Sequence, residues 1–145
     1  MKKIIEKYIQ TVSALKDLPP LIIRAILVYG FYSPAIYKIT DFSGTARWFE
    51  SMGMPFPTLN AYLAGLTEFG GVILLTLGLG TRLISLPLII VMIVAIMTVH
   101  IDNGFSAAKN GIEIPFYFII FLIILIINGP GRLSLDQLIS KRLKK

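Results

Sequence analysis

The sequence predicts an all-α integral membrane protein, a four-helix bundle with flanking amphipathic helices. Of its 145 residues, 55% are hydrophobic and 15% are charged, whereas a soluble domain carries about 25% charged residues. The apolar residues gather into runs that can cross a bilayer, because roughly 20 apolar residues span its ~30 Å hydrocarbon core. A chain of this length is expected to form a single membrane domain over residues 1–145.

Composition excludes several functions. The net charge of +6 would suit nucleic-acid binding, but the basic residues lie at the ends of apolar runs and not on a polar face, so no nucleic-acid partner is expected. The absence of cysteine excludes disulfides and iron–sulfur ligation. The single histidine, His100, excludes haem held by two histidines of one chain and argues against a classical zinc site. Electron transfer would therefore need a bound organic carrier, a partner protein or a site shared between subunits.

Residues 3–15 predict an amphipathic helix, since apolar side chains recur at helical spacing with charged ones opposite. Such a helix usually lies in the membrane interface, and a partner-binding surface is the alternative. No cleavable signal peptide is expected, because no continuous apolar core or small-residue site follows Lys3. Pro19 and Pro20 start the first span, 21–39, and Pro34 is expected to kink it.

Residues 40–58 predict a loop on the far side of the membrane that contains a short, flat helix. Trp48, Phe49 and Met52 form its apolar face, and Gly53 is a suitable C-terminal cap. A tryptophan in this position usually anchors a helix among the headgroups. A lid over the bundle is the alternative interpretation.

Three further spans are predicted at 59–79, 83–100 and 114–128. Gly80 should end the second span and Thr81-Arg82 should form a very short turn, so the third span runs antiparallel beside it. Glycines in the second span should let neighbouring helices approach closely: Gly65, Gly70, Gly71 and Gly78. After the fourth span, a capping box from Ser134 to Gln137 predicts a last amphipathic helix, which ends in Lys141, Arg142, Lys144 and Lys145.

Four spans place both termini on one side of the membrane, and the distribution of basic residues predicts that this side is cytoplasmic. The terminal side would carry Lys2, Lys3, Lys7, Lys16, Arg82, Arg132, Lys141, Arg142, Lys144 and Lys145. The opposite side would carry only Lys38, Arg47 and Lys109.

Glu68 is the main candidate for a functional residue. It lies near the middle of the second span, where a carboxylate costs about 2.5 kcal/mol or more unless it is paired, neutralised or hydrated. At about 1.5 Å per residue it would lie roughly 13 Å below the outer surface. Arg24 could reach it if both side chains stretch, and Lys38 could reach it if Pro34 bends the first span inward.

Each candidate also has a structural interpretation. Glu68 could hold helices together, and Arg24 could extend to the cytoplasmic headgroups. His100 is expected at the outer surface, where it could be an interfacial residue or, with Tyr29 and Tyr32, a neighbour of Glu68 in an outward-opening pocket. Met97 and His100, three residues apart on one helix face, are a weak copper signal, and no metal site is predicted from them.

Several motifs together resemble the DoxX family of small four-helix bacterial membrane proteins over nearly the whole chain. They are Arg24, Lys38, the Gly53-Met54-Pro55-Phe56-Pro57 turn, Glu68-Phe69-Gly70-Gly71, the 75–82 run, residues 95–100 and the 129–136 run. The resemblance implies a bacterial inner-membrane protein of a family often labelled as oxidoreductases or redox-complex subunits. One relative type belongs to a quinone-reducing thiosulfate oxidase, which makes quinone a candidate cofactor.

Residues 98–100, 103–105 and 111–115 look like one branch of that family. This branch accompanies ribosomally made, bufferin-type copper-binding peptides and their maturation enzymes. The resemblance thus implies a role in copper stress, with copper as the second candidate ligand and a link to maturation or export of the peptide.

The sequence therefore predicts an accessory membrane subunit in redox or copper-stress physiology, embedded in lipid and working with protein partners or as a homo-oligomer. One alternative is a quinone-linked oxidoreductase subunit. If the chain takes part in an enzymatic reaction, we expect it to do so only as such a subunit. The other is a small transporter, which would need an oligomer because four helices are few for alternating access.

Overall fold

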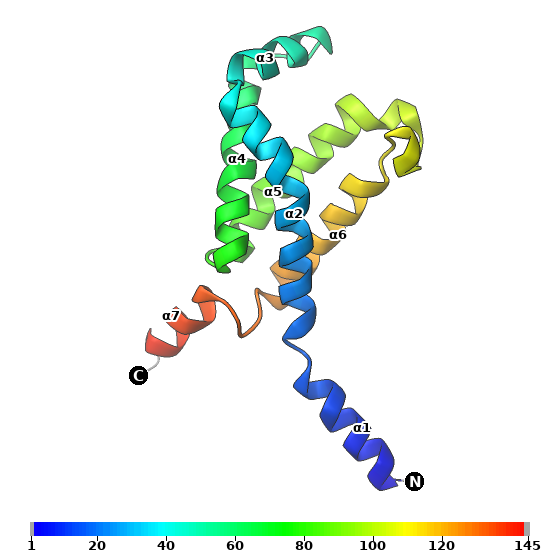
Figure 1. Cartoon of the computed structure of the whole chain (residues 1–145), viewed down its shortest axis with the longest axis vertical. Helices are drawn as coiled ribbons and strands as arrows, with labels where there is room; N and C mark the ends of the chain where they lie inside the picture. The colour runs from blue at the N-terminus through cyan, green and yellow to red at the C-terminus, as the bar shows by residue number, and fades with distance from the viewer. Residues whose placement is uncertain (1, 144–145) are drawn as a thin grey trace.

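A computed structural model describes residues 2–143 (Figure 1). Within that range every regular element is a helix. Lys144 and Lys145, predicted at the end of the last helix, lie outside the described residues, and so do the side chains of Lys2 and Lys7.

Seven α-helices and three short helical turns make up the described chain. The α-helices are α1 (Lys2–Ala14), α2 (Leu18–Thr40), α3 (Phe42–Ser51), α4 (Pro57–Leu77), α5 (Thr81–Ala95), α6 (Glu113–Asn128) and α7 (Leu135–Leu143). A π-helix (Ile96–His100) continues α5, and 3-10 turns follow at Ile101–Asn103 and Ala107–Lys109. The all-α membrane-type fold is confirmed.

Three segments are long and apolar enough to cross a membrane: Leu18–Thr40, Pro57–Leu77 and Thr81–Asn103. The fourth predicted span, α6, is apolar but has only 16 residues, about 24 Å at 1.5 Å per residue. That length is less than the ~30 Å hydrocarbon core, so the fourth crossing stays a prediction.

The turn between α4 and α5 differs from the predicted one. Gly78 and Gly80 adopt the left-handed conformation, with φ of 63° and 58°, which glycine reaches without steric cost. These two residues complete the chain reversal, so Thr81 and Arg82 already belong to α5.

The third span is also not a uniform α-helix. Its last turn widens into the π-helix Ile96–His100. Within this turn the hydroxyl of Thr98 donates to the carbonyl of Val94 at 2.8 Å.

The bundle consists of two helix pairs (Figure 1). α2 packs mainly on α4, and α5 packs mainly on α6. The pairs meet at a core of buried side chains: Leu27, Phe31, Leu75, Leu88, Leu122 and Leu125. Toward the end that carries α3 the pairs diverge, whereas α1 and α7 both lie at the opposite end (Figure 1). We call these the α3 end and the terminal end.

Candidate functional site

An ion pair joins α2 to α4 near the α3 end of the bundle. The ammonium nitrogen of Lys38 lies 2.9 Å from Oε1 and 2.7 Å from Oε2 of Glu68, so it donates to both carboxylate oxygens. Glu68 is 2% exposed, and the side chain of Lys38 is largely buried as well. The pair and its two charge-assisted hydrogen bonds compensate for placing both charges away from water.

Gly65 makes room for this pair. It lies one helical turn before Glu68, and a methyl group at its Cα would lie 3.1 Å from Cβ of Lys38 and 2.9 Å from the Phe42 ring. The bare backbone therefore lets the Lys38 side chain run along α4 toward Glu68. Gly70 does not have the predicted packing role, since nothing lies within 4 Å of the position a Cβ would take there.

The ion pair forms part of the wall of a cavity of about 800 Å³. The cavity lies where the two helix pairs diverge, and its wall is mostly apolar, with Phe31, Met92 and Phe118 among its residues. Trp48, Phe49 and Met54 add an aromatic and thioether wall from α3 and the following loop. Pockets that hold small organic ligands have about 300–1,000 Å³ and are mainly apolar with a few convergent polar groups.

His100 lines the same cavity from the π-helix. Its Nδ1 lies 2.7 Å from the carbonyl oxygen of Asn110. Asn110 has a φ of 58°, which asparagine tolerates better than most residues, and its carbonyl also accepts from the side chain of Asn103 at 3.2 Å. The loop after the third span is thus tied to the histidine that faces the cavity.

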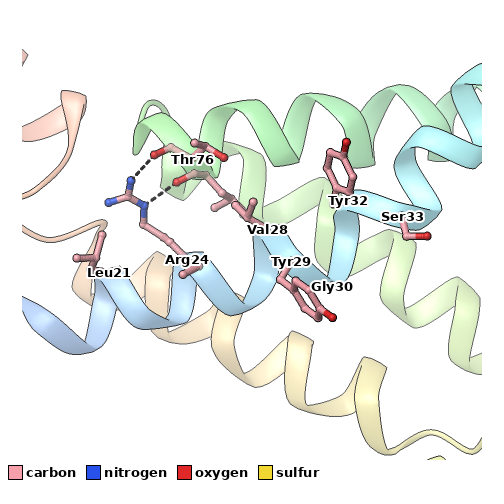
Figure 2. A pocket seen from close by; sticks show the side chains of 10 residues that line it. Leu21, Arg24, Val28, Tyr29, Gly30, Tyr32, Ser33 and Thr76 are labelled. Carbon is pink, nitrogen blue, oxygen red and sulfur yellow. Dashed lines mark hydrogen bonds between the residues drawn. The ribbon is translucent and has the colours of Figure 1, made fainter.

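Arg24 does not pair with Glu68. It is 3% exposed and lies at the terminal end, where Figure 2 shows its guanidinium reaching the last turn of α4. It donates to the carbonyls of Leu75 at 2.7 Å and Thr76 at 2.8 Å, and to those of Leu133 at 2.8 Å and Pro130 at 3.2 Å. The interpretation that Arg24 extends to the headgroups is therefore wrong, because carbonyls left free at the end of α4 bind it first.

Comparison with known proteins agrees with this architecture. The DoxX family profile matches residues 20–101 of the chain, a stretch that contains Arg24, Lys38, Glu68 and His100. The chain belongs to the DoxX family. It is 34% identical over 129 residues to an "Uncharacterized protein" of Haemophilus influenzae, covering 83% of each chain. No solved structure matches it significantly.

Two other relatives carry more informative names. The chain is 28% identical over 130 residues to the inner membrane protein YqjF of Escherichia coli, covering 88% of this chain and 97% of that protein. It is 27% identical over 125 residues to "Putative oxidoreductase CatD" of Bacillus subtilis, covering 86% and 90%. Together with the family match and the three segments apolar enough to cross a membrane, the inner-membrane relative supports a membrane location for this DoxX chain.

Tyr29 and Tyr32, predicted as neighbours of Glu68, lie elsewhere. They line an open groove of about 720 Å³ beside Arg24 and Thr76 on the other side of α2, and Tyr29 is 87% exposed. In Figure 2 their rings point away from the Arg24 guanidinium. Of the predicted residues, the structure thus brings Lys38, Glu68 and His100 to one cavity and leaves Arg24, Tyr29 and Tyr32 outside it.

The geometry does not support the copper signal. Met97 is 67% exposed and does not line the cavity that His100 faces, because the wider π-helical turn changes which residues share a face. Across residues 2–143, no group of three or more His, Cys, Asp or Glu side chains could hold a metal ion.

Three residues that support the site or the bundle could not be identified from the sequence. Asn110 positions His100, and the Asn-Gly dipeptide that it begins is a recognised turn signal. The sequence predicts a general packing role for Gly65 and does not reveal its link to Lys38. Asp136, at the start of α7, accepts from the backbone amides of Gly80 at 2.7 Å and Thr81 at 3.1 Å, a long-range cap of α5 that no local pattern reveals.

Proposed function

We propose that this DoxX chain is an accessory membrane subunit that binds a lipophilic organic carrier of the quinone type and serves redox physiology together with protein partners. The observation that carries the proposal is the Lys38–Glu68 pair in the wall of a mostly apolar cavity of about 800 Å³. An apolar wall suits a ring and its tail, and the few polar groups would orient the head.

The chemistry of the wall residues suits such a carrier. The Lys38 ammonium has three N–H groups and Glu68 accepts two of them, so one remains for a carbonyl oxygen of the ligand. Aromatic side chains such as Trp48 and Phe118 offer surfaces for a flat ring. The oxidoreductase name of the Bacillus subtilis relative agrees with this proposal.

The proposal is tested by purifying the full chain from its native membranes in mild detergent and extracting quinones. Wild type should retain about one quinone per binding site, and Glu68→Gln should lose it, since Gln leaves the Lys38 charge without its counter-ion. Glu50→Gln is the matched control, because Glu50 is exposed on α3 and undergoes the same chemical change.

Other outcomes would replace the proposal. Stoichiometric copper or a co-purifying small peptide, without quinone, would favour the copper-stress role that the family branch implies. A preparation without any ligand, in which Glu68→Gln behaves as wild type in a functional assay, would remove the cavity from the function and leave the transporter alternative for transport assays.

We also propose that the chain lies in the bacterial inner membrane with both termini in the cytoplasm. The basic residues at the terminal end support this orientation. Since the chain has no cysteine, single-cysteine variants can be labelled cleanly. A membrane-impermeant maleimide should label Ser51→Cys on α3 in intact spheroplasts, and Ser140→Cys on α7 only after permeabilisation; the reverse pattern would invert the topology.

A further inference from the structure

The hydrogen bond of His100 fixes which of its ring nitrogens carries the proton. Nδ1 lies 2.7 Å from the carbonyl oxygen of Asn110, and a carbonyl oxygen can only accept, so Nδ1 is the protonated nitrogen. In the neutral ring Nε2 is then an acceptor. Because Nδ1 is engaged with Asn110, Nε2 is the ring nitrogen left to a ligand in the cavity that His100 lines.

The polar groups of the cavity are therefore of opposite hydrogen-bonding character. Lys38 offers one remaining N–H donor beside Glu68, and the neutral ring of His100 offers an acceptor at Nε2. The donor comes from the α2–α4 pair, and the acceptor comes from the turn that ends the third span. A ligand that satisfies both groups must accept a hydrogen bond at one position and donate one at another.

We propose that His100 determines the specificity of this cavity, which selects the reduced, dihydroxy form of an aromatic carrier over the oxidised, dicarbonyl form. A hydroxyl of the reduced form donates to Nε2 of His100, and its other oxygen accepts from Lys38. The dicarbonyl form has no hydrogen-bond donor, so it forms no hydrogen bond with Nε2. A site built to bind a hydroxyl rejects an analogue that lacks it. This inference rests on the proposed function.

The π-helix has a definite part in this arrangement. It occupies Ile96–His100 and directs His100 to the cavity, whereas Met97 of the same turn is 67% exposed and outside it. π-helical turns inside α-helices occur often at functional sites. Met97 therefore provides a control position in the same turn with no contact to the proposed ligand.

The test measures binding of two probes to the full-length protein in nanodiscs under anaerobic conditions. The probes are a decyl-substituted 1,4-naphthoquinol and the matching 1,4-naphthoquinone. Wild type should bind the quinol about tenfold more tightly than the quinone. His100→Phe should abolish this preference, and His100→Gln should keep part of it, because its side-chain carbonyl can accept. Met97→Leu should match wild type.

The outcomes separate this inference from the proposed function. Equal binding of both probes by wild type, or an unchanged preference in His100→Phe, would overturn the role of His100 while the carrier-binding cavity stands. Failure of both probes to bind would overturn the proposed function and the inference with it. Thermal unfolding of each variant identifies any that is misfolded, and His100→Gln then carries the test in place of His100→Phe.

Discussion

Removing one partner of the Lys38–Glu68 pair should lower the free energy of unfolding substantially. Glu68→Gln keeps the size of the side chain but leaves the ammonium of Lys38 with no anionic partner, although that side chain is only 14% exposed. Breaking a buried pair on one side costs about 3–5 kcal/mol in soluble proteins. Interhelical polar contacts in membranes are weaker, about 0.6 kcal/mol on average. Gln keeps one acceptor oxygen for Lys38, so the variant loses one of the two hydrogen bonds and the negative charge. We therefore expect the free energy of unfolding to fall by about 3 kcal/mol, at the lower end of the range for soluble proteins.

A double-mutant cycle with Lys38→Met, Glu68→Gln and the double variant isolates the interaction of the two side chains. Unfolding is followed by circular dichroism as sodium dodecyl sulfate is added to mixed micelles. We expect a coupling energy of about 2 kcal/mol, because the double variant no longer contains an unpaired charge.

The chain contains its own reference pair. Nε of Arg132 lies 3.3 Å from a carboxylate oxygen of Asp17, with 64% and 24% of the two side chains exposed. Exposed pairs contribute about 0–1 kcal/mol, so the cycle of Arg132→Met and Asp17→Asn should give a coupling in that range. A Lys38–Glu68 coupling no larger than that of this surface pair would refute the reasoning that burial makes the pair strong.

Three further variants test the supporting contacts, each by its free energy of unfolding in mixed micelles. Gly65→Ala places a methyl group against Lys38 and should cost about 1–3 kcal/mol, whereas no change would mean that α2 adjusts freely. Arg24→Lys cannot satisfy the four carbonyls bound by the guanidinium and should cost at least about 2 kcal/mol; Arg82→Lys, at an exposed site with one weaker bond of 3.3 Å, is the control and should be nearly neutral. Asp136→Asn should cost about 1 kcal/mol, since the start of α5 loses a charged cap; an unchanged stability would show that the cap is dispensable.

The sequence predicted local features well, because their causes are local. The short helix before Gly53 ends at Ser51. Half of the predicted capping box is present at the start of α7, where the amide of Gln137 donates to Oγ of Ser134 at 3.3 Å. Proline, glycine and residues with hydroxyl side chains start or end a helix within one or two turns of their own position. Their effects can therefore be predicted from neighbouring residues.

The partner of Glu68 could not be chosen from the sequence. Both Arg24 and Lys38 were within reach along the membrane normal, and the choice depends on how α2 is rotated against α4. Two contacts decide it: the carbonyls at the end of α4 bind Arg24, and Gly65 leaves space for the Lys38 side chain. Both contacts join residues far apart in the sequence, so helical periodicity carries no information about them.

The positions of Arg24 and Lys38 also indicate which part of the bundle can move. Arg24 ties α2 to the last turn of α4 at the terminal end, and Lys38 ties α2 to the middle of α4 through Glu68. These two attachments hold α2 and α4 as one unit. α5 and α6 join that unit through the buried core but separate from it toward the α3 end (Figure 1). Any change in the width of the cavity on ligand binding should therefore come from α5, α6 and the π-helix that carries His100.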